Sequence, residues 1–131
     1  ASSTAIGQVI TTMRAQGIKR VVSVTGSAAR LDQEVGSEHR WLATRRSMLM
    51  RHMAGLILDG EEHMRRLVSS GLGWTVLRAP VMTAEAGGTA SLSALPPSPD
   101  TTLGYEAVSV ALVRELVGRE WIGRAPFACR P

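Results

Sequence analysis

Residues 19–26 read Lys-Arg-Val-Val-Ser-Val-Thr-Gly and decide the fold, because a short β-branched run that ends in glycine is typical of a buried strand followed by a loop. The residues before this strand predict a helix. Four apolar residues recur there at helical spacing: Ile6, Val9, Ile10 and Met13. Ser3 or Thr4 can cap the start of that helix with a hydroxyl, and Gly17 suits its end. The first part of the chain therefore predicts a helix followed by a strand.

The rest of the chain alternates between helical and strand patterns. Residues 74–79, Trp-Thr-Val-Leu-Arg-Ala, predict a second strand that Pro80 ends. Apolar spacing predicts a long helical stretch over residues 40–70, with a break near Asp59-Gly60 because the acidic residues that follow suit a new helix start. The remaining expectations are an irregular polar segment over residues 27–39, a loop without secondary structure over 84–102, a helix over 105–117 and a last short strand over 125–129.

This order of elements predicts an α/β fold. Strands separated by helical crossovers form a parallel sheet with right-handed connections, here a small sheet flanked by helices. We expect residues 1–131 to form a single domain in which the strand at residues 19–25 has an unpaired edge. An exposed apolar edge favours association. The sequence therefore predicts that this edge is covered by further N-terminal sequence, by a second copy of the chain, as a homodimer, or by another chain.

Composition predicts a cytoplasmic protein without membrane contact. Hydrophobic residues make up 44% of the chain and charged residues 20%, which is ordinary for a globular domain. No apolar run approaches the roughly 18 residues that span a bilayer. The start at Ala1 has no basic segment before an apolar one, so no secretory signal is expected. The lone Cys129 cannot form an internal disulfide, which favours a reducing compartment.

The distribution of charge and the scarcity of metal-ligating side chains argue against a nucleic-acid partner and against a bound metal ion. The net charge is +4, but the fourteen arginines are spread over the whole chain and Lys19 is the only lysine. This distribution does not form the basic patch typical of nucleic-acid binding, so no nucleic-acid partner is expected. Three scattered histidines and one cysteine lack the spacing of metal ligands, and no metal site is predicted. A serine hydrolase is not favoured either, because a Gly-x-Ser-x-Gly motif is not found.

Three stretches carry a family resemblance: residues 13–25, which end in Gly-Ile-Lys-Arg-Val-Val-Ser-Val-Thr, residues 70–80, Ser-Gly-Leu-Gly-Trp-Thr-Val-Leu-Arg-Ala-Pro, and residues 123–127, Gly-Arg-Ala-Pro-Phe. In order and spacing they resemble the NmrA-like group of atypical short-chain dehydrogenases. The chain is similar to the C-terminal half of flavin and biliverdin reductases and related NAD(P)H-dependent quinone or ketone reductases. The resemblance implies a three-layer Rossmann-like fold without the N-terminal glycine-rich, nucleotide-binding half.

The resemblance also implies a function and a set of site residues. The implied function is an NAD(P)H-dependent reductase with NADP or NAD as cofactor and a small apolar carbonyl, quinone or flavin-like substrate. Ligands of open α/β sheets bind at the carboxyl ends of the strands. The implied cofactor-binding residues at these ends are Thr25, Gly26 and Ser27 after the first strand and Arg78, Ala79 and Pro80 after the second. The loop over residues 84–102 would lie over the substrate.

The sequence departs from the family pattern in three ways. A glycine-rich phosphate loop between a strand and a helix is not found, because Gly71-Leu72-Gly73 precedes a strand. A Tyr-x-x-x-Lys pair is not found either, since Ser109 follows Tyr105 at that spacing. The third departure is near Gly60, where some relatives of the family carry a lysine and this sequence does not. Two alternatives therefore stay open: a truncated descendant that does cofactor-independent isomerase, cyclase or hydrolase chemistry, and a non-catalytic module that binds or senses a nucleotide.

Each candidate residue also has a structural interpretation. Thr25 and Ser27 could orient a substrate carbonyl as catalytic residues, or form local backbone bonds at a strand end. Asp59 and His63 could serve as a catalytic acid and base, or belong to a solvated helix start. Arg78 could bind an anionic group of the cofactor, or form a structural ion pair. The methionines of the long helix could line an adaptable pocket, or belong to the core or a dimer interface: Met48, Met50, Met53 and Met64.

Overall fold

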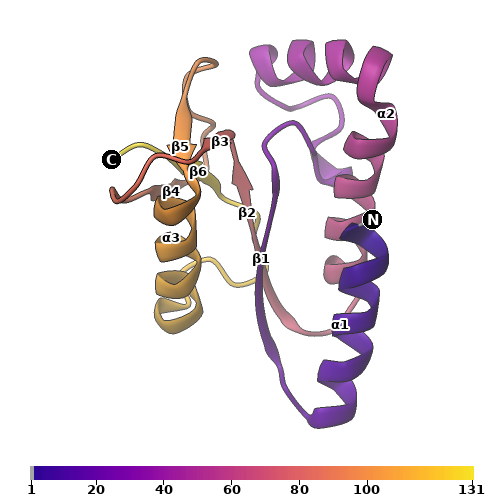
Figure 1. Ribbon diagram of the computed structural model, residues 1–131. Coiled ribbons are helices and arrows are strands. Elements are labelled where there is room, and N and C mark those ends of the chain that lie inside the picture. Colours follow the sequence, from indigo (N-terminus) through magenta and orange to yellow (C-terminus); the bar gives the residue numbers. More distant parts are fainter. Residues whose placement is uncertain (1) are drawn as a thin grey trace.

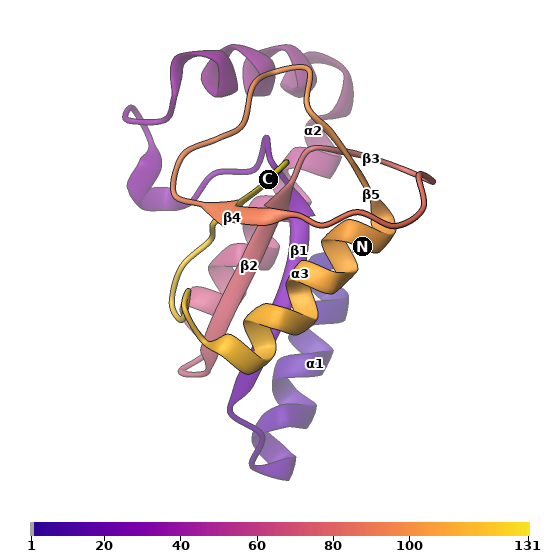
Figure 2. The same ribbon diagram turned by 90° about the vertical axis from the view of Figure 1, so that its left-hand side faces the viewer.

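The computed structural model describes residues 2–131 as an α/β fold in three layers. Helices α1 and α2 cover one face of a sheet and α3 covers the other, as Figures 1 and 2 show from two sides. The elements in chain order are α1 (Ser2–Gln16), β1 (Arg20–Gly26), the 3₁₀ turn η1 (Asp32–Glu34), α2 (Arg40–Val68), β2 (Gly73–Ala79), β3 (Val81–Thr83), β4 (Ser91–Ser93), β5 (Thr102–Gly104), α3 (Tyr105–Gly118) and β6 (Phe127–Cys129).

The main sheet has four strands in the order β1-β2-β6-β4. Strands β1 and β2 are parallel over their full length, from Arg20 opposite Gly73 to Gly26 opposite Ala79. Strand β6 is parallel to β2, which confirms the small parallel sheet expected from the sequence. Because β1 and β2 run in register, their carboxyl ends lie side by side at one edge of the sheet.

Strand β1 forms one border of this sheet. Within residues 2–131 it pairs with β2 alone, so its other edge has no strand beside it. The strand connects α1 to the segment that leads into α2, and its side chains are mostly half-buried. The unpaired edge expected from the sequence is therefore present in this part of the chain.

The expectation of a loop without secondary structure over residues 84–102 is wrong. Strand β4 lies in the middle of this segment and pairs antiparallel with β6, with Leu92 opposite Ala128. Strand β5 begins at its end and pairs with β3. Strands of three residues are too short to show an alternating pattern, and they form only because a distant partner supplies the hydrogen bonds. The segment is therefore held against the sheet at its centre.

The expected helix break near Asp59-Gly60 is also wrong. Helix α2 continues through both residues and bends instead at Met53, whose φ of −138° and ψ of 37° are not helical. Figure 1 shows the consequence: the part of α2 before the bend lies across the top of the molecule, and the part after it packs along α1. We refer to residues 40–52 as the arm of α2. The bend carries this arm out over the carboxyl ends of β1 and β2.

The core lies between the sheet and the pair of helices α1 and α2. Met64, Leu67 and Val76 are completely buried there, and Ile6 and Ile10 of α1 pack in the same cluster. A second, smaller cluster under α3 joins strand β2 to β5 and β6. The second cluster includes Ala79 at the carboxyl end of β2 and Val108 of α3, so β2 is packed against α3 as well as against the side of α1 and α2. No helix of residues 2–131 is both long and apolar enough to cross a membrane.

Candidate functional site

A cavity of about 690 Å³ opens at the carboxyl ends of β1 and β2. Its volume lies in the range of small-molecule sites. Six of the site residues expected from the sequence line it: Thr25, Gly26, Ser27, Asp59, Ala79 and Pro80. Helix α2 closes the other side of the cavity with residues on both sides of its bend, among them Leu49 and Ile57. The fold therefore brings together residues from β1, β2 and α2 that lie far apart in the sequence.

Two hydroxyl groups supply hydrogen-bonding capacity at the floor of this cavity. The backbone N–H of Ser27 donates to the carbonyl oxygen of Ala79 at 2.8 Å, which fastens the end of β1 to the end of β2. The side-chain hydroxyls of Thr25 and Ser27 make no hydrogen bond to another group of residues 2–131 and both residues line the cavity. A hydroxyl donates one hydrogen bond and accepts two. These two groups are therefore free to bind a carbonyl or amide of a ligand.

Gly60 allows α2 to approach β1 closely at this point. A Cβ atom at Gly60 would lie 2.7 Å from Oγ1 of Thr25 and 3.4 Å from Cβ of Ala29. Any larger residue would push Thr25 out of its position. This close packing explains why a glycine stands inside the helix, where the sequence indicated a helix end. The residue positions the Thr25 hydroxyl through contact, without a side chain of its own.

Asp59 lines the cavity, but its carboxylate is engaged by the start of α1. One oxygen accepts hydrogen bonds from the backbone N–H and the hydroxyl of Ser2, both at 2.8 Å. The other accepts from the backbone N–H and hydroxyl of Ser3. The hydrogen bonds from Ser3 and Ser2 hold the pKa of Asp59 well below its usual value. Asp59 is therefore ionised at neutral pH, which suits a fixed negative charge and does not suit a general acid.

His63 is placed away from the cavity that it was expected to serve. Its ring is buried, with 6% of the residue exposed. Its Nε2 atom lies 2.8 Å from the hydroxyl of Ser23 on β1, and its Nδ1 atom lies 3.4 Å from the carbonyl oxygen of Ser2 on α1. The imidazole thus joins three elements inside the core. The arrangement gives His63 a structural position, and it does not support the expected pairing with Asp59 as acid and base.

The burial of His63 predicts a loss of stability in mild acid. Burial lowers the pKa of His63 below its ordinary value of 6.5, so the unfolded chain binds a proton more readily than the folded one. The stability that neutral His63 contributes is then fully present above about pH 6.5 and is lost as the pH drops below this value. We expect the free energy of unfolding, measured by urea titration, to decrease between pH 7.5 and 5.5, and His63→Gln to show a weaker decrease. His52→Gln, on the exposed side of α2, should keep the wild-type profile. Equal profiles for all three proteins would contradict the prediction.

Arg78 forms a structural ion pair, which was one of the two roles that the sequence allowed for it. Its guanidinium binds both carboxylate oxygens of Glu34, at 2.6 and 3.0 Å. Its Nε donates to the carbonyl oxygen of Ala125 at 2.8 Å, and the group lies over the ring of Phe127, 4.0 Å from its centre. The residue is 5% exposed and does not line the cavity. The expectation that Arg78 binds an anionic group of a cofactor is therefore not supported by this geometry.

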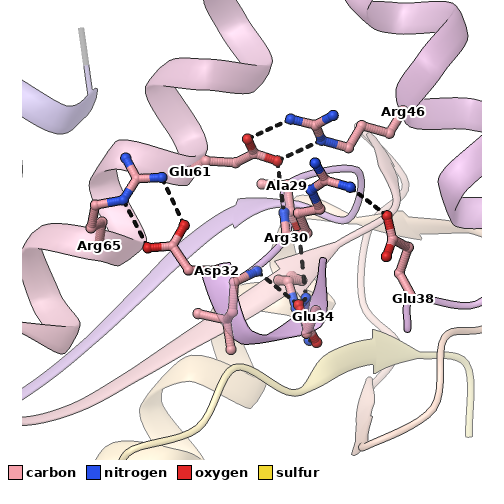
Figure 3. Close-up of polar contacts among 10 residues, drawn as sticks. Ala29, Arg30, Asp32, Glu34, Glu38, Arg46, Glu61 and Arg65 are labelled. Atoms are coloured by element: carbon pink, nitrogen blue, oxygen red, sulfur yellow. Dashed lines mark hydrogen bonds and ion pairs between the residues drawn. The ribbon is translucent and has the colours of Figure 1, made fainter. Parts of the chain in front are cut away.

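The segment after β1 is held in place by further ion pairs that connect it to α2. Figure 3 shows Glu61 of α2 binding Arg46 of the arm and the backbone N–H of Arg30. Arg65 pairs with Asp32 beside them. The Arg46–Glu61 pair is largely buried, and it also ties the two parts of α2 together across the bend at Met53. Sequence reasoning missed these contacts, because the paired residues lie far apart along the chain.

A second cavity of about 810 Å³ adjoins the first. Arg45, Leu49 and Val81 line both, so the two cavities are neighbours. The arm of α2 forms its roof. Of the four methionines weighed as pocket residues, Met48 lines this second cavity and Met64 belongs to the core. We refer to the two as the inner cavity, at the strand ends, and the outer cavity, under the arm.

One family model, described as NAD(P)H-binding, matches residues 1–117 of this sequence. The chain belongs to this NAD(P)H-binding family. The match extends over the strand ends, the inner cavity and helix α2. No curated protein is similar enough to the sequence to count as a relative. Within residues 2–131 no group of three or more histidine, cysteine or acidic side chains could hold a metal ion.

Several solved structures share the fold of this chain. A putative NAD-dependent epimerase/dehydratase from Bacillus halodurans superposes with a TM-score of 0.71 at 20% identity, over 97% of this chain and 53% of the other. A short-chain dehydrogenase/reductase from Veillonella parvula in complex with NADP gives 0.72 at 16% identity, over 98% and 58%. A Rossmann-fold NAD(P)-binding family protein from Shigella flexneri gives 0.65 at 19% identity, over 99% and 55%. These likenesses show a Rossmann-type fold, and this chain spans a little more than half the length of each structure.

The inner cavity fits one end of such a dinucleotide. Its hydroxyls at Thr25 and Ser27 and its apolar wall at Ala79 and Pro80 suit an uncharged amide-bearing ring. A Cβ atom at Gly26 would meet nothing within 4 Å, so a flat ring has room to approach the backbone there. The phosphates are different. Within residues 2–131 no glycine-rich turn joins a strand directly to a helix, which is the usual cradle for a pyrophosphate. The residues thus fit the nicotinamide end and do not account for the phosphates.

Proposed function

We propose that this chain forms the nicotinamide and substrate side of an NAD(P)H-dependent reductase that acts on a small apolar carbonyl, quinone or flavin-like substrate. The observation that carries the proposal is the pair of free hydroxyls, Thr25 and Ser27, at the carboxyl ends of two parallel strands in an inner cavity of about 690 Å³. Membership of the NAD(P)H-binding family over residues 1–117 supports the choice of cofactor.

The residues of the chain contribute binding and orientation. A bound reduced nicotinamide would supply the hydride, because the cofactor carries this chemistry. The hydroxyls of Thr25 and Ser27 would donate hydrogen bonds to the carboxamide of the cofactor or to the carbonyl oxygen of the substrate. Ala79 and Pro80 would press against the ring and exclude water from that side. Asp59, held ionised by Ser2 and Ser3, would fix the start of α1 beside the cavity.

The cofactor-independent alternative is less well supported. It requires an acid and a base that face the same cavity, and His63 lies in the core instead. Asp59 faces the cavity but is held in its ionised form. Hydride transfer from a bound nicotinamide needs no acid-base pair on the protein, because the proton that balances it would reach the reduced oxygen from solvent through the hydroxyl of Thr25 or Ser27. The arrangement of groups therefore favours the reductase.

A nucleotide titration tests the proposal directly. We expect the purified chain to enhance and shift the fluorescence of NADPH or NADH in a saturable way, and a panel of quinones and aromatic aldehydes to oxidise the bound nucleotide. The double variant Thr25→Val/Ser27→Ala removes both hydroxyls while nearly preserving side-chain volume, and should weaken nucleotide binding about tenfold or more, as the loss of two hydrogen bonds implies. Saturable binding without any turnover would instead favour a nucleotide-sensing module. Absence of binding by the wild-type chain would refute both.

We also propose that another polypeptide, either a second copy of this chain or a different one, covers the free edge of β1. An unpaired strand edge is an unstable surface to expose, and within residues 2–131 β1 pairs with β2 alone. Native mass spectrometry should then show a species heavier than the 14.0 kDa chain. A monomer at all concentrations, without any retained partner, would contradict this part of the proposal.

A further inference from the structure

The outer cavity has a wall that combines an aromatic ring, aliphatic side chains and unpaired cations. Trp41, Met48 and Leu49 on the arm of α2 face Val81 and Pro99 across it. Met48 is 60% exposed and Val81 is 65% exposed, although both are apolar. Exposed apolar side chains that gather around a hollow mark a binding site more often than scattered ones do. The volume of about 810 Å³ is enough for a ligand of several rings.

The charges around this cavity are all of one sign. Its charged lining residues are Arg40 and Arg45, with the titratable His39 beside them, and no acidic residue lines it. Two other arginines, on the arm and on the segment before it, are neutralised within residues 2–131. Arg46 pairs with Glu61, and Arg30 pairs with Glu38. Neither Arg40 nor Arg45 forms an ion pair with a carboxylate in this part of the chain. The cavity therefore favours an anionic ligand.

Arg45 lies where the outer cavity meets the inner one, since it lines both. Its guanidinium lies over the ring of Trp41, 4.9 Å from the centre, and it donates a hydrogen bond to the carbonyl oxygen of Pro99. This contact leaves most of its five N–H donors unused. A guanidinium in this position can bind a carboxylate with two parallel hydrogen bonds. The Trp41 ring holds the side chain at the border between the two cavities.

We propose that the outer cavity binds an aromatic carboxylate, with the ring system against Trp41 and Met48 and the carboxylate on Arg45. This inference rests on the proposed function and narrows it: the reducible group of the substrate would extend from the carboxylate-bearing ring into the inner cavity, toward Thr25 and Ser27. A neutral quinone or aldehyde of the same size would fill the apolar wall equally well. It would leave the cations without a counter-ion, and would therefore bind more weakly.

The test compares two ligands of nearly the same shape, one anionic and one neutral, in the absence of nucleotide. Naphthalene-2-carboxylate and naphthalene-2-carboxamide are titrated into the full chain by calorimetry. We expect the carboxylate to bind at least about tenfold more tightly, which corresponds to about 1.4 kcal/mol. Arg45→Gln should remove this preference, because it lowers the affinity for the carboxylate far more than the affinity for the carboxamide. Arg51→Gln is the matched control, because Arg51 is an exposed arginine on the same arm that lines neither cavity. Trp41→Leu should weaken both ligands together.

The outcomes separate this inference from the proposed function. A preference for the carboxylate that is lost in Arg45→Gln and kept in Arg51→Gln supports it, even in a chain that fails to bind NADPH. Equal affinities for the two ligands in the wild-type chain overturn it, even where NADPH binds. A preference that survives in Arg45→Gln also overturns it, because the charge recognition would then lie elsewhere. Thermal unfolding of each variant confirms that the fold is intact before the affinities are compared.

Discussion

Glu34→Ala should lower the free energy of unfolding by about 3–5 kcal/mol, the usual cost of leaving a buried charge without its partner. Arg78 is 5% exposed and its two terminal nitrogens both bind the Glu34 carboxylate. The same carboxylate accepts a hydrogen bond from the backbone N–H of Leu31 at 2.8 Å. Removing the Glu34 carboxylate therefore leaves the Arg78 guanidinium without its ionic partner and loosens the turn η1. A typical domain is stable by about 5–15 kcal/mol, so the loss would remove much of the total.

Two comparisons make this prediction specific. Asp32→Ala breaks the pair with Arg65 on the same segment, where the two side chains are 70% and 48% exposed. Solvent screens such a pair, so we expect a much smaller loss of stability. Glu34→Met combined with Arg78→Met removes both buried charges, and should be more stable than Glu34→Ala because no unpaired charge remains. The measurement is urea unfolding at pH 7.5. Equal losses for Glu34→Ala and Asp32→Ala would show that burial of Arg78 does not control the effect.

Local sequence patterns predicted those parts of the fold that local forces determine. The β-branched run before Gly26 and the run from Trp74 to Ala79 form strands because their own side chains favour an extended, buried backbone. Their parallel pairing and the position of Thr25, Ser27 and Pro80 at one edge of the sheet follow from the helical crossover between them. The inner cavity was therefore predictable in outline from two short stretches of sequence.

Contacts between distant residues were not predictable in this way. Whether Arg78 faces a ligand or the interior depends on Glu34, which lies 44 positions away and on a turn without regular pattern. Gly60 resembles a helix end in sequence, yet the approach of Thr25 gives it a packing role. The bend at Met53 shows no proline or other strong signal, although it creates the arm that roofs the outer cavity. Each of these features is set by a partner that a local pattern does not contain.

Gly26→Phe should abolish nucleotide binding, by about 100-fold or more, without a comparable loss of stability. Gly26 lines the inner cavity at the end of β1, and a Cβ atom there would meet nothing within 4 Å, so a side chain at this position has open space at the mouth of the cavity. Its backbone is that of an extended strand, so a phenylalanine requires no change of conformation. The ring would enter the open space that the proposed nicotinamide needs. A filled site leaves the nicotinamide no favourable contacts, and the cofactor would lose most of its binding free energy at this end.

The control for Gly26→Phe is the same residue change on another surface. Gly118 ends α3, and a Cβ atom there also meets nothing within 4 Å, but it does not line the inner cavity. Gly118→Phe should therefore bind NADPH as the wild-type chain does, which excludes a general effect of one more exposed aromatic ring. Binding is measured by NADPH fluorescence, and folding by thermal unfolding. Wild-type affinity in Gly26→Phe would mean that the nucleotide binds elsewhere. It would also contradict the role assigned to Thr25 and Ser27, because all three residues line the same cavity.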